Sequence, residues 1–490
     1  MKKPVSCLLI CILFLFCALP AAGAEHVYST KELVSGYYTY LLQEDGTAMI
    51  TLYNGEEVIL NVPETIDGVK VTAIGPSAFE KGKGKETLAE VNIPEGIVSL
   101  GDYAFRWCTE LEMVSIPDTL KDIGLNPFAG CDSLSIEINE KHPYLRLVSD
   151  VLYSLADRRL VYYSGQRKKG AYKLPNGIRI IGASAFYQCE NITELVIPKK
   201  NDSDPNDVGL TAIGRRAFYH CENLQAINLE DANISTIGAE AFAGCNKLKK
   251  VAFPSKVTSI AERAFEGCTN LEELVLPETI TSIGEMAFRK CSSLTVVELP
   301  EGVTAIGKNT FAECKELTEI VMPEELTYIG GGAFQNCEEL KKLELPEAVD
   351  YIGSEAFDGC ITLEEITIPD TCSYIGANAF RSCKALAKIV LPSYLYTISP
   401  STFSGCIALA EVALPEELEE IGEGAFFYCL ALKEIEIPDP VEIIGDFAFS
   451  HCLALERVVL PEDLETIGRN TFENCDLLTD LPDLSDMYED

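Results

Sequence analysis

The chain has 490 residues and a formal net charge of −37, from 39 Lys and Arg against 76 Asp and Glu. A surface this acidic repels nucleic-acid phosphates and anionic lipid, which excludes both as main partners. Length alone would allow several domains, but an internal repeat takes precedence over a domain count based on length.

The first segment, residues 1–24, has the layout of an export signal. Two lysines precede an apolar run from Val5 to Leu19, and Ala22-Gly23-Ala24 follows. This order predicts a cleaved signal peptide, so residues 1–24 take no part in the fold arguments. No later apolar stretch is long enough to span a membrane. We therefore expect a secreted or cell-surface protein without a recognisable anchor.

A repeat marked by phenylalanine runs through the rest of the chain, and from Phe242 to Phe472 every step is 23 residues. In one copy, Leu271 to Pro277 alternates apolar and polar residues like a short strand that the proline ends. Ala287, Phe288 and Cys291 then follow at the spacing of one helical face. Each copy is thus predicted to form a strand, a turn and a short helix. Copies of this kind must stack to bury their apolar faces, which predicts a leucine-rich-repeat solenoid.

A glycine follows the second isoleucine of most copies, but Ala261 and Ser399 replace it in two. Neither residue adopts a positive φ at low cost. The position is therefore predicted to require small size rather than left-handed geometry.

Cysteine occupies the position three residues after the phenylalanine in fifteen copies, from Cys108 to Cys475. In stacked copies their Cβ vectors run parallel about 5 Å apart, too far for relaxed disulfide geometry. We predict a ladder of buried thiols, with disulfides or a metal site as alternatives; a metal requires ligands that converge, and a ladder does not. Cys372 lies outside the ladder, and its redox state stays open.

The unit C-x-x-L-x-x-[VIL]-x-[IL]-P-x-x-[VIL]-x-x-I-G-x-x-[AT]-F-x-x-C resembles the BspA-like family of bacterial leucine-rich repeats, of the TpLRR type. The leader from Tyr37 to Phe79 is similar to the family's β-rich N-terminal unit, and the interruption from Asn139 to Ile181 resembles its inserted hairpin. The resemblance implies an α/β solenoid, a right-handed coil with a parallel β-sheet on its concave face and short helices on its convex face. The expected segments are a signal peptide (1–24), a β-rich N-terminal cap (25–70), leucine-rich repeats (71–138), a β-hairpin insertion (139–181), leucine-rich repeats (182–475) and an acidic C-terminal cap or tail (476–490).

The chain offers no convergent set of catalytic groups. His220 and His451 lie about ten repeats apart, roughly 50 Å at the spacing of paired strands. A calcium-like loop at Asp202, Asp204 and Asn206 lacks the glycine and glutamate of an EF-hand loop. We therefore expect no enzyme activity and no cofactor. The resemblance implies an adhesin or another module that binds an extracellular-matrix or bacterial surface protein; the alternative is a rigid spacer or a self-associating surface-layer component.

Valines and charged residues are predicted to share the open face of the parallel sheet, and such an amphipathic face suits a protein partner. Opposite charges on neighbouring strands are expected to pair, namely Lys250 with Glu273, Glu319 with Lys342 and Glu365 with Lys388. The hairpin and the insertion at 199–209 are the alternative binding surfaces, as insertions often lie on the working side of a repeat array. The candidate protein-binding residues on the concave face are Val275, Val296, Glu298, Val321, Glu344, Thr367, Val390 and Val459.

Overall fold

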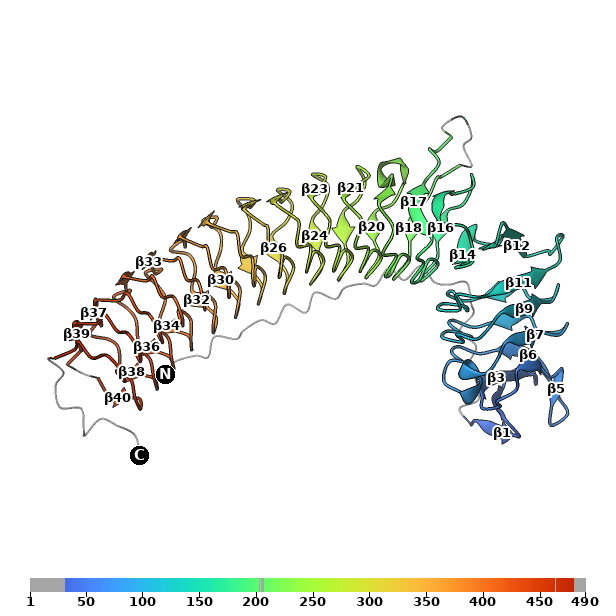
Figure 1. The fold of residues 1–490 in the computed structure, drawn as a ribbon, viewed down its shortest axis with the longest axis horizontal. Coiled ribbons are helices and arrows are strands. Elements are labelled where there is room, and N and C mark those ends of the chain that lie inside the picture. Colours follow the sequence, from blue (N-terminus) through green and yellow to red (C-terminus); the bar gives the residue numbers. More distant parts are fainter. Residues whose placement is uncertain (1–30, 202, 204–206, 463, 480–490) are drawn as a thin grey trace.

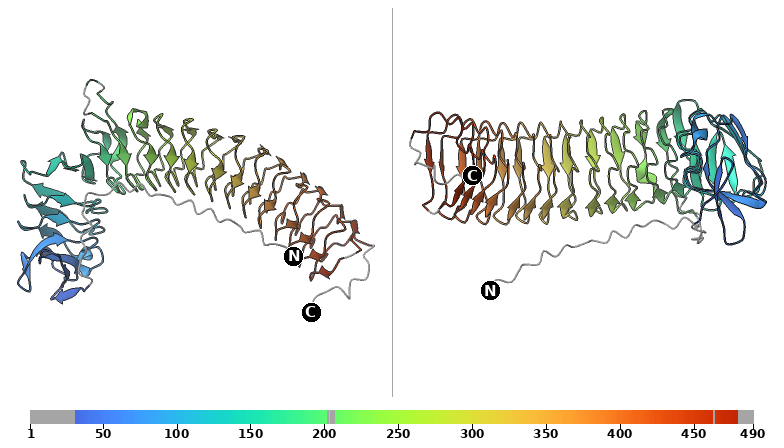
Figure 2. Two further views of the ribbon diagram at one scale, coloured as in Figure 1. Left: turned by 180° about the vertical axis from the view of Figure 1, so that it is seen from behind. Right: turned by 90° about the horizontal axis from the view of Figure 1, so that it is seen from below.

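The computed structural model describes residues 31–201, 203, 207–462 and 464–479. They form two stacks of short coils that meet at a corner, a short N-terminal stack and a long curved C-terminal stack (Figure 1). Figure 2 shows the same two stacks from behind and from below. The predicted signal peptide and most of the acidic tail lie outside the described residues.

The N-terminal stack contains two sheets. One has the order β1-β2-β3-β6-β8-β10 with β5 paired to β6, and the other the order β11-β9-β7-β4. The strands are β1 (Leu33–Ser35), β2 (Tyr38–Leu42), β3 (Ala48–Tyr53), β4 (Ile59–Asn61), β5 (Thr65–Ile66), β6 (Val69–Ile74), β7 (Glu90–Asn92), β8 (Ser99–Leu100), β9 (Met113–Ile116), β10 (Asp122–Ile123) and β11 (Ser135–Ile138).

Each coil of the C-terminal stack carries two short strands that pair in parallel with the neighbouring coils. The first series, here called the leucine strands, comprises β15 (Gly170–Lys173), β17 (Ile192–Val196), β19 (Ala226–Ile227), β21 (Lys250–Ala252), β23 (Glu273–Val275), β25 (Val296–Glu298), β27 (Glu319–Val321), β29 (Lys342–Glu344), β31 (Glu365–Thr367), β33 (Lys388–Val390), β35 (Glu411–Ala413), β37 (Glu434–Glu436) and β39 (Arg457–Val459). The second series, the isoleucine strands, comprises β16 (Ile180–Ile181), β18 (Ala212–Ile213), β20 (Thr236–Ile237), β22 (Ser259–Ile260), β24 (Ser282–Ile283), β26 (Ala305–Ile306), β28 (Tyr328–Ile329), β30 (Tyr351–Ile352), β32 (Tyr374–Ile375), β34 (Thr397–Ile398), β36 (Glu420–Ile421), β38 (Ile443–Ile444) and β40 (Thr466–Ile467).

The corner is built by an antiparallel strand set, β12 (Leu145–Val148), β13 (Val151–Ser154) and β14 (Arg159–Tyr163). Strand β14 pairs in parallel with β16, so this set begins the first isoleucine-strand sheet of the C-terminal stack. The buried apolar residues form two separate clusters, one in each stack. The β13–β14 hairpin contributes side chains to both clusters and is the wall between them.

A column of stacked phenylalanines fills the interior of each stack. Phe357 and Phe380, for example, are fully buried, with ring centroids 5.3 Å apart and planes inclined by 4°. The cysteine three residues later is buried beside this column, and the Cys383 thiol donates to the carbonyl of Phe357 at 3.3 Å. Because each copy supplies the same groups at the same phase, each coil completes the core of the one before it.

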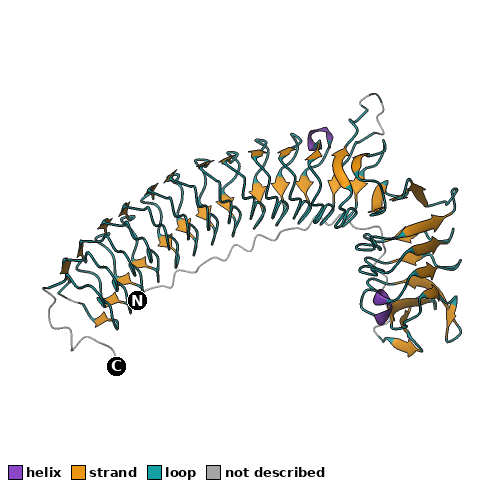
Figure 3. Cartoon of the chain, in the orientation of Figure 1, coloured by secondary structure: helices purple, strands orange, loops and turns teal. Residues whose placement is uncertain are grey.

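The predicted short helices are wrong. In the part of the chain that the structure describes, the only helices are two short 3₁₀ turns, η1 (Lys83–Glu86) and η2 (Leu229–Asp231) (Figure 3). The segment around each phenylalanine is instead a run of turns. The alanine, phenylalanine and cysteine of each turn segment have the spacing of one helical face, although the segment is not helical. The sequence pattern therefore predicted a helix that does not form.

The backbone explains why no helix forms there. Residues two before and two after the phenylalanine have positive φ, as at Met286 (58°) and Lys290 (62°) around Phe288. Alternate amides donate to the next coil, Phe288 to the carbonyl of Thr310 at 3.0 Å, while the others close four-residue turns, Cys291 to the carbonyl of Phe288 at 3.1 Å. A helix would keep all of these bonds within its own segment. Stacking diverts half of them to the neighbouring coil.

Candidate functional site

The predicted valine positions lie together on the outward side of the leucine strands. In β23, β25, β27 and β33 the middle residue points into the core and the two flanking residues are exposed. This alternation follows from the two-residue period of a strand whose one face is buried. We call these outward positions the valine face, and they comprise Val275, Val296, Glu298, Val321, Glu344, Thr367, Val390 and Val459.

The valines of this face are unusually accessible for large apolar side chains. The exposed fractions are 63% for Val275, 58% for Val390 and 45% for both Val296 and Val321, whereas Val459 is half-buried. Register places Glu298 beside Val321 on β25 and β27, so apolar and acidic positions alternate across the sheet. The sheet of β21, β23, β25 and β27 carries four of the eight predicted positions.

The valine face does not line the concave side of the stack, where the resemblance placed it. Figure 1 labels β21, β23, β33, β37 and β39 along the outer edge of the arc. The turn segments hydrogen-bond from coil to coil at every repeat, as from Phe357 to Ala379 at 2.8 Å, whereas the leucine strands separate into several sheets. The closely joined turns therefore form the inner side and the splayed strands the outer one.

Of the expected charge pairs on the leucine strands, Lys250 with Glu273 is confirmed, whereas the other two lysines pair differently. Lys342 contacts Glu365 at 3.0 Å and Lys388 contacts Glu411 at 2.8 Å, and both pairs are exposed. Each lysine thus reaches forward to the following coil, rather than back to Glu319 or Glu365. Water and salt screen exposed pairs of this kind, so they contribute little to stability and leave the face able to bind.

The ladder thiols are buried and carry no disulfide, as predicted. Burial raises the pKa of Cys268, Cys314 and Cys360 to about 12, which keeps them protonated and poorly nucleophilic. Cys372 is buried too, and burial raises its pKa to about 11. These thiols act as small core residues rather than as reactive groups.

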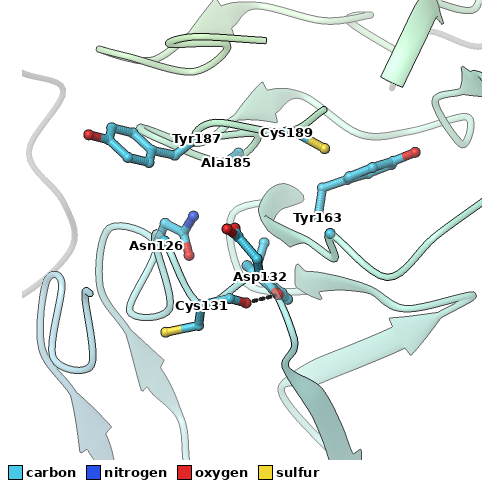
Figure 4. Close-up of a pocket in the computed structure, with 10 residues that line it drawn as sticks. Asn126, Cys131, Asp132, Tyr163, Ala185, Tyr187 and Cys189 are labelled. Atoms are coloured by element: carbon cyan, nitrogen blue, oxygen red, sulfur yellow. Dashed lines mark hydrogen bonds between the residues drawn. The ribbon is translucent and has the colours of Figure 1, made fainter. Parts of the chain in front are cut away.

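The enzyme hypothesis would need a cleft beside the hairpin, and the cavity that the described residues line there is small (Figure 4). Its volume is about 10 Å³, room for a single water molecule at most. Tyr162 donates to the carbonyl of Cys131 at 2.9 Å across this cavity, and Asn126, Tyr163 and Tyr187 also line it. No organic substrate fits this space.

Within the described residues, the other predicted features form no site. His220 and His451 lie on separate turn segments, and His451 stacks on Tyr428 with centroids 4.3 Å apart. Of the calcium-like loop, Asp202, Asp204 and Asn206 lie outside the described residues. The described residues contain no group of three or more metal-ligating side chains, and none of their helices could cross a membrane.

One surface row escaped the sequence analysis. Tyr328, Tyr351 and Tyr374 occupy the same position on β28, β30 and β32 and stack outside the core. Their spacing of 23 residues was a usable signal. The signal is weak because only three consecutive copies carry a tyrosine there, while other copies have Thr236, Ala305 or Thr397 at the same position.

Comparisons with known proteins agree with this architecture. The family model described as the BspA type leucine rich repeat region matches residues 68–146, 163–274, 211–340, 259–387 and 373–482. A crystal structure of a leucine-rich repeat protein from Bacteroides ovatus is similar with 28% identity and a TM-score of 0.55, covering 87% of this chain and 100% of that chain. A leucine rich cell surface protein from Faecalibacterium prausnitzii is 23% identical with a TM-score of 0.34, covering 92% of this chain and 94% of that one. No curated protein matches the chain.

Proposed function

The chain belongs to the BspA-type leucine-rich-repeat family, and from this premise we propose that it is an exported, non-enzymatic protein-binding solenoid, an adhesin at the cell surface. The family suggests a protein-interaction repeat module. The ligand class that we propose is an extracellular-matrix protein or a bacterial surface protein. The apolar leader of residues 1–24 supports the proposal of export.

The observation that carries this proposal is the valine face. Val275 and Val390 expose about three-fifths of their side chains, at 63% and 58%, on two parallel sheets of the same face, β21–β27 and β33–β35. Apolar side chains repeated along one face lose contact with water when a partner covers them, which favours association. Interspersed acids, among them Glu298 and Glu344, restrict which partner surfaces fit, because an unpaired charge in an interface is costly.

The test is binding of residues 25–490 to a panel of matrix and bacterial surface proteins at physiological salt. The variant Val321→Lys with Val390→Lys places two charges in the centre of the valine face. We expect it to weaken binding at least about tenfold, because burying an unpaired lysine costs more than about 1.4 kcal/mol. Thermal unfolding of the variant should match the unmodified protein, since both side chains point away from the core.

A matched control is Val58→Lys with Val98→Lys. These valines are similarly exposed, 59% and 42%, but lie in the N-terminal stack, outside both the valine face and the hairpin. The proposal holds if the control binds normally and the valine-face variant does not. Equal loss in both variants would point to nonspecific charge effects. Absence of any ligand, with self-association that the valine-face variant abolishes, would support the spacer or surface-layer alternative instead.

A further inference from the structure

Three tyrosines form a stack on the outer side of the isoleucine strands. The ring centroids of Tyr328 and Tyr351 are 4.8 Å apart, as are those of Tyr351 and Tyr374, with planes inclined by 10° and 13°. The strand register sets this spacing, since the three residues pair directly across β28, β30 and β32. Tyr328 and Tyr374 are 39% and 42% exposed, although aromatic side chains usually avoid such exposure.

The next coil carries two more exposed tyrosines. Tyr394 and Tyr396 precede β34 and are 62% and 47% exposed. We call the set of Tyr328, Tyr351, Tyr374, Tyr394 and Tyr396 the tyrosine patch. It lies on different strands from the valine face, so the two surfaces can be altered separately.

The stack leaves the outer ring face at each of its ends without an aromatic neighbour. The residue paired with Tyr328 on the preceding strand is Ala305, whose side chain is too small to cover a ring. The corresponding position one repeat after Tyr374 is Thr397, also exposed. The π-faces of Tyr328 and Tyr374 are thus available to a ligand. Such a face attracts cations, above all guanidinium groups.

The surroundings of the patch are acidic. The five segments 323–330, 346–353, 369–376, 392–399 and 415–422 contain nine Asp or Glu residues and no Lys or Arg. Asp350 directly precedes Tyr351, and Glu420 lies beside Thr397 in the register of β34 and β36; both acids are exposed. A cation on the tyrosine rings would therefore also be attracted by carboxylates.

We propose that the tyrosine patch binds an extended basic polypeptide segment through its arginine or lysine side chains. Five coils at about 4.8 Å span roughly 20 Å, the length of about six extended residues. Cationic side chains of such a segment lie over the ring faces of Tyr328 and Tyr374 and near the surrounding acids. A neutral glycan would gain only the two ring faces and nothing from the carboxylates, which makes it the weaker candidate.

The test uses the full chain and two fluorescein-labelled peptides, an eight-residue Arg-Pro repeat and a Gln-Pro repeat of equal length, in fluorescence anisotropy titrations. The binding variant is Tyr328→Thr, Tyr351→Thr and Tyr374→Thr combined. Threonine already occupies this strand position at Thr236, Thr397 and Thr466, so the fold accommodates it. The control is Tyr37→Thr, which removes an exposed tyrosine (59%) from the N-terminal stack.

We expect the Arg-Pro peptide to bind the unmodified chain and the control equally, and the triple variant about tenfold more weakly. The Gln-Pro peptide should bind the unmodified chain at least about tenfold more weakly than the Arg-Pro peptide. Unchanged Arg-Pro binding by the triple variant would overturn the proposal and leave only general charge attraction. Tighter binding of a neutral polysaccharide that depends on the tyrosines would also overturn it, in favour of a glycan site. None of these outcomes tests the valine face, because its residues are unchanged in the unmodified chain, the triple variant and the control.

Discussion

Tyr162 and Tyr163 are consecutive residues of β14, yet they pack into different cores. The Tyr162 ring meets Phe128 edge-on, with centroids 5.8 Å apart, in the N-terminal cluster. The Tyr163 ring lies 4.6 Å from Phe186 in the C-terminal cluster. Successive side chains of a strand point to opposite faces, so one strand continues two phenylalanine columns at once. The corner of the molecule is therefore a shared wall and not a linker.

This relationship predicts that the two tyrosines stabilise different arms. Replacing Tyr162 with alanine should speed amide exchange mainly in the coils before residue 138, and replacing Tyr163 mainly in the coils after residue 182. Each substitution should lower the free energy of unfolding by about 3–5 kcal/mol, the range for a buried aromatic side chain. Hydrogen-exchange mass spectrometry of both variants checks this. Tyr144→Ala, at a partly exposed position (37%) near the same hairpin, serves as the control and should change little.

Two glycines at the position after the second isoleucine, Gly284 and Gly307, form a matched pair for a substitution test. A Cβ on Gly284 would lie 2.4 Å from the amide nitrogen of Glu262, whereas the nearest atom to a Cβ on Gly307 is 3.4 Å away. Neither glycine has a positive φ, so whether the position accepts a larger residue depends on the space around it alone. This agrees with the prediction that the position requires small size. Gly284→Ala should destabilise the protein by about 1–3 kcal/mol. Gly307→Ala should be neutral or slightly stabilising in chemical denaturation. Equal effects would show that the contact with the preceding coil is not the cause.

The carboxylate of Glu240 predicts a pH dependence of stability. It is almost fully buried, and it accepts hydrogen bonds at 2.7 Å from both Arg215 and Arg216. Burial alone would raise the pKa of Glu240, but the two arginines outweigh it and lower that pKa below its ordinary value. The stabilisation is thus present above the ordinary glutamate pKa and is lost as the pH falls through the lowered one.

Glu240→Gln should therefore lower the free energy of unfolding by about 1–2 kcal/mol at pH 7, because it removes charged hydrogen bonds. The difference from the unmodified protein should shrink as the pH falls below about 4. Denaturant unfolding at a series of pH values measures this. Glu301→Gln, an exposed acid, should show no such trend. A difference that stays constant down to pH 2 would contradict the assignment.

Thiol reactivity should separate the end of the ladder from its interior. Cys475, the last ladder member, is 8% exposed and its pKa is lowered by its interaction with Cys452, whereas Cys314 is fully buried and burial raises its pKa to about 12. At pH 8 a thiolate-selective reagent should label Cys475 first in the folded protein, as mass spectrometry can map. In denaturant without reductant all sixteen described thiols should react. Fewer than about fourteen would indicate disulfides and overturn the free-thiol ladder.

Much of the architecture could be predicted from the sequence because each sequence repeat of a solenoid forms one structural coil. The phase of Phe288 and Cys291 identified inward positions, and the alternation around Leu274 identified Val275 as an outward one. Inward or outward direction depends on the local period of the backbone, which the residue pattern reports directly.

The sequence by itself thus determined the stacked repeat, its buried phenylalanine and thiol columns, and which strand residues face water. Only the tertiary structure decided that turns replace helices, because their amides bond to the next coil, a partner that no local pattern reveals. It alone also decided that Tyr162 and Tyr163 serve two cores and that the valine face lies on the outer edge of the arc. Curvature arises from differences in spacing between coils, and the corner arises from the wall that β13 and β14 share; both are properties of contacts and not of any single copy.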